Sequence, residues 1–436
     1  MEKLLEMAKQ HCDKAEIYSI EYSDNIAAFQ NAKLHETESS FQSGFSLRII
    51  KDGKEGFAYT RNLIDRQELL DNALISIKGG VDAGYDFPLT KNLPQVESYD
   101  ESLQNLTTSQ IVDEGGRVCE MFKAKTDAEI QVSVAKHIEK VRLINTAGTD
   151  LSNESSYFYI SGVLVIPGGG SGFYRVYQSK KYEALSADKI NELVSLYLPA
   201  KKEASFSGGK MKVLFMPNSQ STLKWRVASG TNSKSLYQNT TPIADKLGQK
   251  IFSDNLTIYN DPLDSSHPGA TAFDDEGIAT SKLMLVENGV FKSFYYDLNY
   301  AAKLGSKTTG NGFKSAFFGG DIITLKPAPS LRHMRIQPGD KSLAEVIGMM
   351  DRGVIVEGAL GGHSGNIPNG DYSIGISPGL YVENGEIVGS AKEVMVSGNI
   401  YETLNNVIAI GDTQQYASGM WVPPLLCDNV SVATKN

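Results

Sequence analysis

The chain has 436 residues, of which 41% are hydrophobic and 21% charged, and its formal net charge at pH 7 is −9. This composition is typical of a soluble globular protein, and the length exceeds one ordinary hydrophobic core, so two domains are expected. The acidic balance, together with the lack of a dense run of Lys and Arg, argues against direct binding to nucleic acid.

The amino-terminal segment, MEKLLEMAKQ, is amphipathic and acidic, which is unlike a secretory signal. No apolar run approaches the ~18 residues that a membrane-spanning helix needs. The three cysteines, Cys12, Cys119 and Cys427, lie far apart and form no CxxC motif, a pattern typical of buried thiols in a reducing compartment. We therefore expect a cytoplasmic protein with no membrane association.

The first half of the chain predicts both helices and strands. Alternating residues on both sides of Asp52-Gly53 predict a β-hairpin, because both central residues of a type I′ turn need a positive φ. The glycine-rich segment Pro167–Gly172 lacks the spacing of a phosphate-binding loop, so we interpret it as a flexible loop or linker. The expected helices are Met1–Lys14, Leu63–Lys78, Ser109–Lys123 and Ser186–Leu198, and the expected strands are Ile17–Tyr22, Asn25–Phe29, Gly44–Ile50, Gly56–Thr60, Gln131–Ile144 and Tyr157–Ile166.

The composition of Ser205–Lys210, SFSGGK, indicates a boundary between a domain of residues 1–206 and one of residues 207–436. Beyond it, Asn288-Gly289 and Asn384-Gly385 predict two more hairpins. Strands outnumber helices and come in hairpins, so the predicted class is α+β, with large, mostly antiparallel sheets and flanking helices in both domains. The expected helices here are Ser219–Ser229, Pro242–Ile251 and Ser342–Met350, and the expected strands include Met211–Met216, Lys282–Val286, Val290–Tyr296 and Val354–Glu357.

Three consecutive carboxylates, Asp274, Asp275 and Glu276, precede the hairpin at Asn288-Gly289. The strands of that hairpin are almost uninterruptedly apolar, so we expect them deep in a sheet. An acidic corner on a rigid hairpin can position a site. The alternative interpretation is a solvated turn, whose Asp side chains accept hydrogen bonds from nearby backbone N–H groups.

The six histidines include no HxxxH or HxxxxH pair, which excludes a zinc site of the HExxH type. A metal site assembled in the folded protein from His267, His333, His363 and the acidic stretch is conceivable. His363 is either a general base or a solvated loop histidine. No GxSxG motif is present, and Thr309 is either a nucleophile or a turn residue.

Short motifs along most of the chain resemble the TldD/PmbA family, whose members have been called modulators of DNA gyrase. Each motif is weak alone, and their shared order and spacing carry the resemblance. The motifs are NAKLHE at 31–36, LRIIKDG at 47–53, GFAYT at 56–60, FDDEG at 273–277, ENGV at 287–290, TGNG at 309–312, NGDYS at 369–373 and ENGEI at 383–387.

The resemblance implies a two-domain α+β protein related to a peptidase complex. In that complex a TldD-type subunit carries a zinc motif HExxxH and a PmbA (TldE-type) subunit does not. Where the motif would fall, this chain has Ser219–Arg226, SQSTLKWR, with neither an imidazole nor a carboxylate. Lys224 and Arg226 would also repel a divalent cation. The chain is therefore identified as a member of the PmbA branch, without catalytic residues, metal ligands or cofactors of its own.

From the resemblance we expect a homodimer, or a heterodimer with a TldD-like HExxxH subunit, that binds an extended unfolded or leader peptide in an internal cavity. The acidic stretch 274–276 would hold the surrounding loops in place. The alternative is a stand-alone peptidase or other hydrolase with a different active site, around Thr309, His363 and Asp371. The residues expected to line the peptide cavity are Thr309, Gly310, Asn311, His363, Asn366, Asp371 and Ser373.

Overall fold

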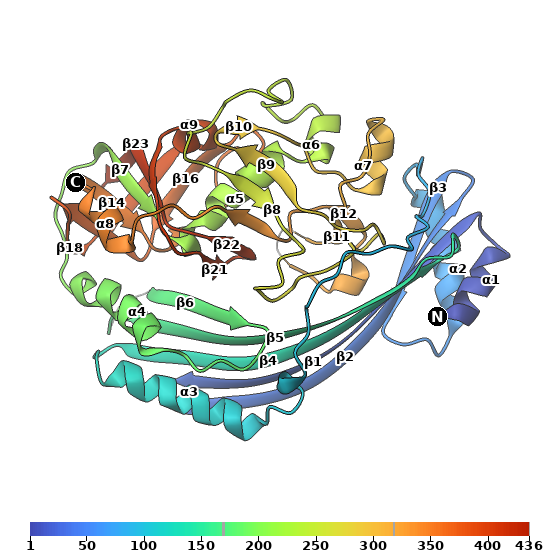
Figure 1. Ribbon diagram of the computed structural model, residues 1–436, viewed down its shortest axis with the longest axis horizontal. Helices are drawn as coiled ribbons and strands as arrows, with labels where there is room; N and C mark the ends of the chain where they lie inside the picture. Colours follow the sequence, from blue (N-terminus) through green and yellow to red (C-terminus); the bar gives the residue numbers. More distant parts are fainter. Residues whose placement is uncertain (168–170, 317–318, 436) are drawn as a thin grey trace.

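A computed structural model describes residues 1–167, 171–316 and 319–435 of the chain. Residues 168–170, within the predicted loop or linker Pro167–Gly172, lie outside the described residues. Four long antiparallel strands dominate the fold: β1 (Lys14–Gln30), β2 (Lys33–Lys51), β4 (Glu129–Asn145) and β5 (Asp150–Val165). Figure 1 shows them running side by side and curving beneath the carboxyl-terminal half of the chain.

These four strands lie next to one another, toward the β3 edge of a 12-stranded sheet with the order β10-β9-β8-β13-β22-β21-β6-β5-β4-β1-β2-β3. β3 (Lys54–Thr60) lies at one end, and β6 (Gly172–Ser179) pairs with β5 and with β21 (Gln415–Ala417). The sheet therefore contains strands from both sides of residue 206, and the boundary between domains 1–206 and 207–436 stays a prediction. Its remaining strands are β8 (Ile258–Asn260), β9 (Leu283–Glu287), β10 (Val290–Phe291), β13 (Met334–Ile336) and β22 (Met420–Val422).

A second, 9-stranded sheet is built from the carboxyl-terminal half, with the order β15-β16-β19-β23-β7-β14-β17-β18 and β20 paired to β23. In the two sheets, the parallel pairs are β13 with β22 and β7 with β14, and the other pairs are antiparallel. The strands are β7 (Gly209–Phe215), β14 (Arg352–Val356), β15 (Ala359–Leu360), β16 (Asp371–Ile376), β17 (Gly379–Glu383), β18 (Glu386–Ser390), β19 (Val394–Asn399), β20 (Val407–Ile410) and β23 (Leu425–Thr434).

Helices cover both ends of the long strands of the 12-stranded sheet, which is called the long sheet below. At one end α1 (Glu2–Lys9) and α2 (Arg66–Ser76) pack on β1, β2 and β3 through Leu4, Leu70 and their neighbours. At the other end α3 (Thr108–Lys123) and α4 (Ala187–Ala200) share one core with the 9-stranded sheet. Thr107 and Gln110 form a capping box that fixes the start of α3 by satisfying free backbone N–H groups.

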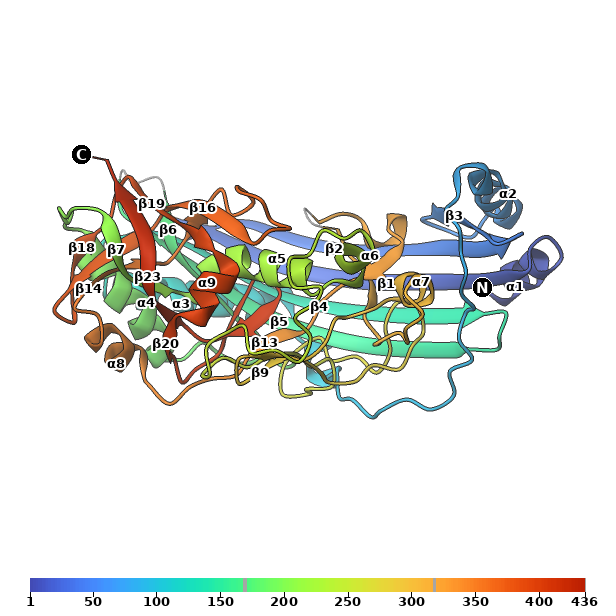
Figure 2. The same ribbon diagram turned by 90° about the horizontal axis from the view of Figure 1, so that it is seen from above.

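The opposite face of the 9-stranded sheet packs on α5 (Ser221–Gly230), on α9 (Ile400–Asn405) and on β8, β9, β13 and β22. Figure 2 shows the long strands extending beyond this compact part toward α1 and α2. The predicted α+β class, with mostly antiparallel sheets and flanking helices, is confirmed. The shorter elements are α6 (Ser233–Tyr237), α7 (Leu298–Lys303), α8 (Leu343–Gly348), β11 (Gly312–Lys314) and β12 (Pro327–Pro329).

The three predicted Asx-Gly hairpins are present, and both residues of each turn have a positive φ: Asp52-Gly53, Asn288-Gly289 and Asn384-Gly385. The strands predicted at Ile17–Tyr22 and Asn25–Phe29 are one strand, β1. None of the described helices is both long and apolar enough to traverse a lipid bilayer.

Two local predictions were wrong. The segment Pro242–Ile251 forms turns, not a helix. Its end pairs with the hairpin instead, because the N–H groups of Gly248 and Ile251 donate to Phe291 O and Gly289 O. That hairpin also lies at one end of the 12-stranded sheet, not deep within it, although Leu285, Val286 and Phe291 are fully buried. Leu285 and Val286 are buried in the core against the 9-stranded sheet, and Phe291 is buried against Ile243 and Phe294.

Gly289 and Gly53 occupy the same position in two hairpins and differ in what surrounds them. Both have a left-handed backbone, with φ of +79° and +72°. A Cβ on Gly289 would lie 2.3 Å from Phe252 O, whereas a Cβ on Gly53 would have no neighbour within 4 Å. Gly53→Ala should cost about 1 kcal/mol for the backbone conformation alone. Gly289→Ala should cost about 1–3 kcal/mol more, because the overlap forces the backbone to move.

The measurement is the midpoint of thermal unfolding of both variants beside the unsubstituted protein. Gly53→Ala serves as the control for the turn conformation. Equal midpoints for the two variants would show that the contact of the hairpin with Phe252 does not constrain the fold.

Candidate functional site

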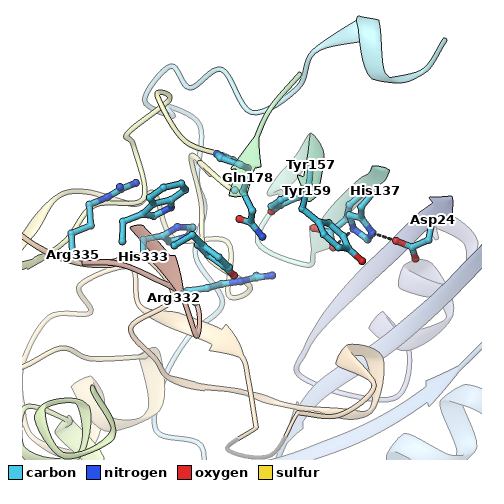
Figure 3. A pocket seen from close by; sticks show the side chains of 14 residues that line it. Asp24, His137, Tyr157, Tyr159, Gln178, Arg332, His333 and Arg335 are labelled. Carbon is cyan, nitrogen blue, oxygen red and sulfur yellow. Dashed lines mark hydrogen bonds and ion pairs between the residues drawn. The ribbon is translucent and has the colours of Figure 1, made fainter. Parts of the chain in front are cut away.

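A cavity of about 420 Å³ lies between the curved long sheet and segments of the carboxyl-terminal half. Side chains two residues apart point to the same face of a strand, so His137 and Glu139 of β4 share a face, as do Tyr157 and Tyr159 of β5. In the sheet register Asp24 lies opposite His137, and His137 opposite Tyr157. The register thus gathers these side chains on the wall of the cavity that the sheet provides (Figure 3).

His137 binds the two carboxylates of this wall. Its Nδ1 lies 2.7 Å from Asp24 Oδ1, and its Nε2 lies 3.8 Å from Glu139 Oε2. Burial lowers the pKa of His137, but the hydrogen bonds and charges of Asp24 and Glu139 outweigh burial and raise that pKa to about 9. His137 is therefore a cation at neutral pH. It cannot act as a general base there, because its nitrogens already carry protons.

The opposite wall is cationic and comes from residues 332–335. The Arg332 side chain is 39% exposed, and its Nη1 lies 3.8 Å from Asp275 Oδ2. Arg335 is buried, and its Nη2 lies 3.3 Å from Asp264 Oδ2. Between them, burial and then the charges of Arg332, Arg335 and Lys224 lower the pKa of His333 to about 3. His333 is therefore neutral in the physiological range.

The acidic stretch 274–276 is buried, so its interpretation as a solvated turn was wrong. Asp274, Asp275 and Glu276 are 0%, 5% and 1% exposed. Asp274 accepts hydrogen bonds from the N–H groups of Glu276, Ile278 and Gly312. The backbone hydrogen bonds expected of an Asp in a turn are thus present. The segment nevertheless lies beneath β11 and against β2, and these strands shield it from solvent.

Glu276 joins the long sheet to the carboxyl-terminal half. Arg48 of β2 donates to Glu276 Oε1 at 3.0 Å and to Glu16 Oε1 of β1 at 2.8 Å. The second oxygen of Glu276 accepts from the N–H of Leu298 at 2.7 Å. Burial raises the pKa of Glu276, and Arg48 opposes that rise. This is a buried, hydrogen-bonded ion network in which each charge depends on its partners.

The turn at Thr309, Gly310 and Asn311 lies beside the acidic stretch. The Gly312 N–H donates to Asp274 Oδ2 at 2.8 Å, which anchors the end of the turn. Thr309 Oγ1 donates to Asn311 Oδ1 at 2.8 Å, and Asn311 Nδ2 donates to Ser330 O. Asn311 is only 1% exposed. The polar groups of this turn therefore support the loop structure.

His363, Asn366, Asp371 and Ser373 lie elsewhere. His363 and Asn366 are exposed in the loop before β16, Asp371 is exposed at the start of that strand, and Ser373 faces Ser397 in the β16–β19 pairing. The seven predicted cavity residues thus fall in two separate places, and none of them lines the cavity of Figure 3. Sequence reasoning missed Asp24, Glu139 and Arg332, although the alternation of His137 and Glu139 along one strand was a usable signal.

Helix α5 lies where the family resemblance places HExxxH in metal-bearing members. Arg226 of this helix is fully buried, and its guanidinium donates to the carbonyl oxygens of Thr222, Gly362, Ser364 and Asp371 at 2.7–2.9 Å. The residues of α5 include no side chain that binds zinc. Within residues 1–167, 171–316 and 319–435, no three His, Cys, Asp or Glu side chains are grouped so as to hold a metal ion. The conceivable site from His267, His333, His363 and the acidic stretch is therefore not assembled there.

Asp297 extends the buried acidic network and also caps α7. It is 2% exposed, and its Oδ1 accepts from the Tyr300 N–H at 2.7 Å. Burial, and then the charge of Glu276, raise the pKa of Asp297 to about 7. A folded-state pKa above the unfolded one means that the folded state binds more protons. The contribution of Asp297 to stability is thus largest at low pH and is lost as the pH rises toward 7.

Asp297→Asn should keep the helix cap and remove the charge. We expect the variant to be more stable than the unsubstituted protein, and its advantage in unfolding free energy to grow by about 2 kcal/mol between pH 5 and pH 8. Chemical denaturation of both proteins across this range measures the advantage. An advantage that is constant or falls with pH would mean that Asp297 is ionised throughout.

Comparisons with known proteins agree with the motifs and the fold. Residues 208–434 match the family model described as the PmbA/TldA metallopeptidase C-terminal domain, and residues 15–76 match PmbA/TldA metallopeptidase domain 1. An uncharacterized protein of Methanocaldococcus jannaschii is 24% identical over 425 residues, which cover 95% of each chain. A metalloprotease PmbA homolog of Haemophilus influenzae is 26% identical over 336 residues, which cover 71% of this chain and 69% of the relative.

Among solved structures, TldE from Thermococcus kodakarensis superposes with a TM-score of 0.90 at 24% identity, covering 99% of both chains. This likeness concerns the fold, which is the same long curved sheet with its companion sheet. With the family model spanning residues 208–434 as well, the chain belongs to the PmbA/TldD family.

Proposed function

We propose that this chain is a PmbA (TldE-type) subunit, without zinc, of a cytoplasmic peptidase complex that acts on unfolded or leader peptides. In this proposal it forms a dimer with a second subunit of the same fold. The preferred partner carries HExxxH and so supplies the zinc site that this chain lacks. The cavity between the long sheet and residues 332–335 receives part of an extended peptide. The metallopeptidase family of the chain and its PmbA-named relatives support a role in proteolysis.

The observation that carries the proposal is the environment of Arg226. At the position where a metal-bearing member has its zinc ligands, the guanidinium is surrounded by carbonyl oxygens of the loop Gly358–Asp371 and of its own helix. A buried guanidinium with four hydrogen bonds cannot be removed without leaving these acceptors unsatisfied. A zinc ion does not fit this set of groups, since it would meet a fixed positive charge and no ligand.

The cavity has the size and chemistry of a binding site. Its volume of about 420 Å³ falls in the range of small-ligand sites. Tyr157, Tyr159 and Trp421 line the cavity with aromatic rings, of which Trp421 is stacked on His267 on one face. Such rings can pack against apolar side chains, and Gln178 carries both a donor and an acceptor for a peptide backbone. Such a lining supports binding of a short extended segment with limited sequence preference.

The alternative is a stand-alone hydrolase. At Thr309, the predicted nucleophile, the structure gives no sign of activation. Thr309 Oγ1 donates its one proton to Asn311 Oδ1 and accepts from the N–H of Tyr296, so this proton is not directed to a base. In the cavity, His137 contacts two carboxylates and is protonated at neutral pH. Activity of this chain alone is therefore the outcome that would favour the alternative.

We expect peptide cleavage only when the chain is mixed with an HExxxH-bearing family member. Hydrolysis of an unfolded fluorogenic peptide by each protein alone and by the mixture measures this. Tyr159→Ala should lower the rate of the mixture about tenfold, because it removes an aromatic contact in the cavity. Tyr59→Ala is the matched control, since Tyr59 lies on β3 at 53% exposure and away from the cavity.

His363→Ala and Asn311→Ala, tested in the same mixture, decide whether the two loops predicted from the sequence contribute to peptide binding. If the HExxxH-bearing member is as active alone as in the mixture, the subunit role is wrong. If this chain cleaves the peptide alone and a chelator has no effect, the hydrolase alternative replaces the proposal.

We also expect the purified chain to hold no stoichiometric zinc. Arg226 and Lys224 provide positive charge where family members that bind zinc have ligands, and the structure offers no replacement set among the described residues. Elemental analysis after extensive dialysis measures the content. About one zinc ion per chain would contradict the assignment to the branch without zinc.

A further inference from the structure

We propose that the wall formed by Arg332, His333 and Arg335 is a carboxylate-binding subsite, which takes either the terminal carboxylate or an acidic side chain of the bound peptide. The inference rests on the proposed function, since it concerns the same cavity, and it adds the chemical class of the group that is recognised.

Arg335 is the first observation. Its side chain is 4% exposed, and its contact with an acidic group is the 3.3 Å pair between Nη2 and Asp264. Its Nε and Nη1 donors are buried and have no hydrogen-bond partner among the described residues. Buried N–H donors that remain unpaired cost free energy, about 1–3 kcal/mol each and more for charged groups. A ligand with an oxygen acceptor would remove this cost.

His333 is the second observation. Its Nε2 is buried and lacks a partner in the described part of the chain. Burial, and then the charges of Arg332, Arg335 and Lys224, lower the pKa of this ring and keep it neutral. In the tautomer with a proton on Nε2, the ring can donate a hydrogen bond, and three positive charges act on it. An anion bound there would meet an unused donor in a positive field.

Arg332 is the third observation. Its guanidinium reaches toward the middle of the cavity in Figure 3 and is 39% exposed. It forms no hydrogen bond among the described residues. Asp275, at 3.8 Å, instead accepts from the Lys314 N–H at 2.7 Å, and the Phe313 ring lies 5.6 Å from Arg332 Cζ. The fork of a guanidinium matches the two oxygens of a carboxylate.

The sheet wall shows why the ligand group is an anion. Asp24 and Glu139 are paired with His137, and the charge of Glu139 also acts on Arg332. Figure 3 places Asp24 and His137 at the opposite end of the cavity from Arg335. At the Arg335 end, the buried groups without a hydrogen-bond partner among the described residues are Nε and Nη1 of Arg335 and Nε2 of His333. Nε and Nη1 are donors, and Nε2 is a donor when it carries the proton.

Binding of three forms of one probe to the full-length chain tests the subsite. The probe is an N-acetylated alanine pentapeptide with a free carboxyl terminus, with a carboxyl-terminal amide, or with the amide and a central glutamate. Calorimetric titration at low salt measures the three dissociation constants. We expect at least one carboxylate-bearing form to bind about tenfold more tightly than the plain amide, as charge-assisted hydrogen bonds require.

Arg332→Gln should bind all three forms with the affinity that the unsubstituted protein has for the plain amide. Arg332→Lys should keep part of the preference for a carboxylate because it keeps the charge. Arg332 is chosen over Arg335 because its partial exposure makes the substitution compatible with folding, which the thermal midpoint checks. Arg61→Gln is the control, since Arg61 is 47% exposed and pairs with Asp321 on the outer part of the molecule.

The pattern of preference identifies the source of the carboxylate. Tight binding of the free-acid form alone assigns the subsite to peptide carboxyl termini, and tight binding of the glutamate form as well extends it to acidic side chains. Equal affinity of all three forms, or an unchanged preference in Arg332→Gln, overturns the subsite and leaves peptide binding intact. Binding of none of the forms overturns both the subsite and the peptide cavity.

Discussion

The ion network around Arg48 is the interaction on which the arrangement of the two halves depends. Arg48 lies on β2 of the long sheet, is 4% exposed, and contacts Glu16 of the same sheet and Glu276 of the carboxyl-terminal half. Its guanidinium also lies 5.0 Å from the centre of the Phe87 ring. Removing one partner would leave the others charged and buried, which typically costs several kcal/mol. Arg48 and both carboxylates are buried, so water cannot replace a lost partner. The network therefore holds the curved sheet against the other half of the chain.

This network also sets the position of the cavity. Asp274 and Asp275 hold the N–H groups of Gly312 and Lys314, and Asp275 lies beside Arg332. The residues that bring the halves together are thus one contact away from the cationic wall. A displacement of the acidic stretch would move Arg332 relative to the sheet wall that carries His137. Fold stability and the geometry of the cavity are consequently difficult to vary separately.

The sequence predicted well what is decided locally. The three Asx-Gly turns form because positive φ at both residues is a property of the turn itself. The helix expected at Pro242–Ile251 failed because its backbone pairs with Gly289 and Phe291, a tertiary contact that outweighs local propensity. Burial of the acidic stretch could not be foreseen, since Arg48 is 228 residues away from Glu276 in the chain. The pairing of Asp24 with His137 spans 113 residues, which also hides it from local patterns.

The family motifs and the residues that line the cavity lie in different parts of the molecule. FDDEG and TGNG contact each other through Asp274 and Gly312, so their spacing reflects how the two halves are joined. A Cβ on Gly312 would lie 2.2 Å from Glu276 Oε2, which explains why glycine is required next to this carboxylate. The cavity residues Asp24, His137 and Arg332 lie outside all these motifs. FDDEG and TGNG therefore hold the joint between the two halves, whereas the cavity lining and the buried Arg226 of α5 lie outside these two motifs.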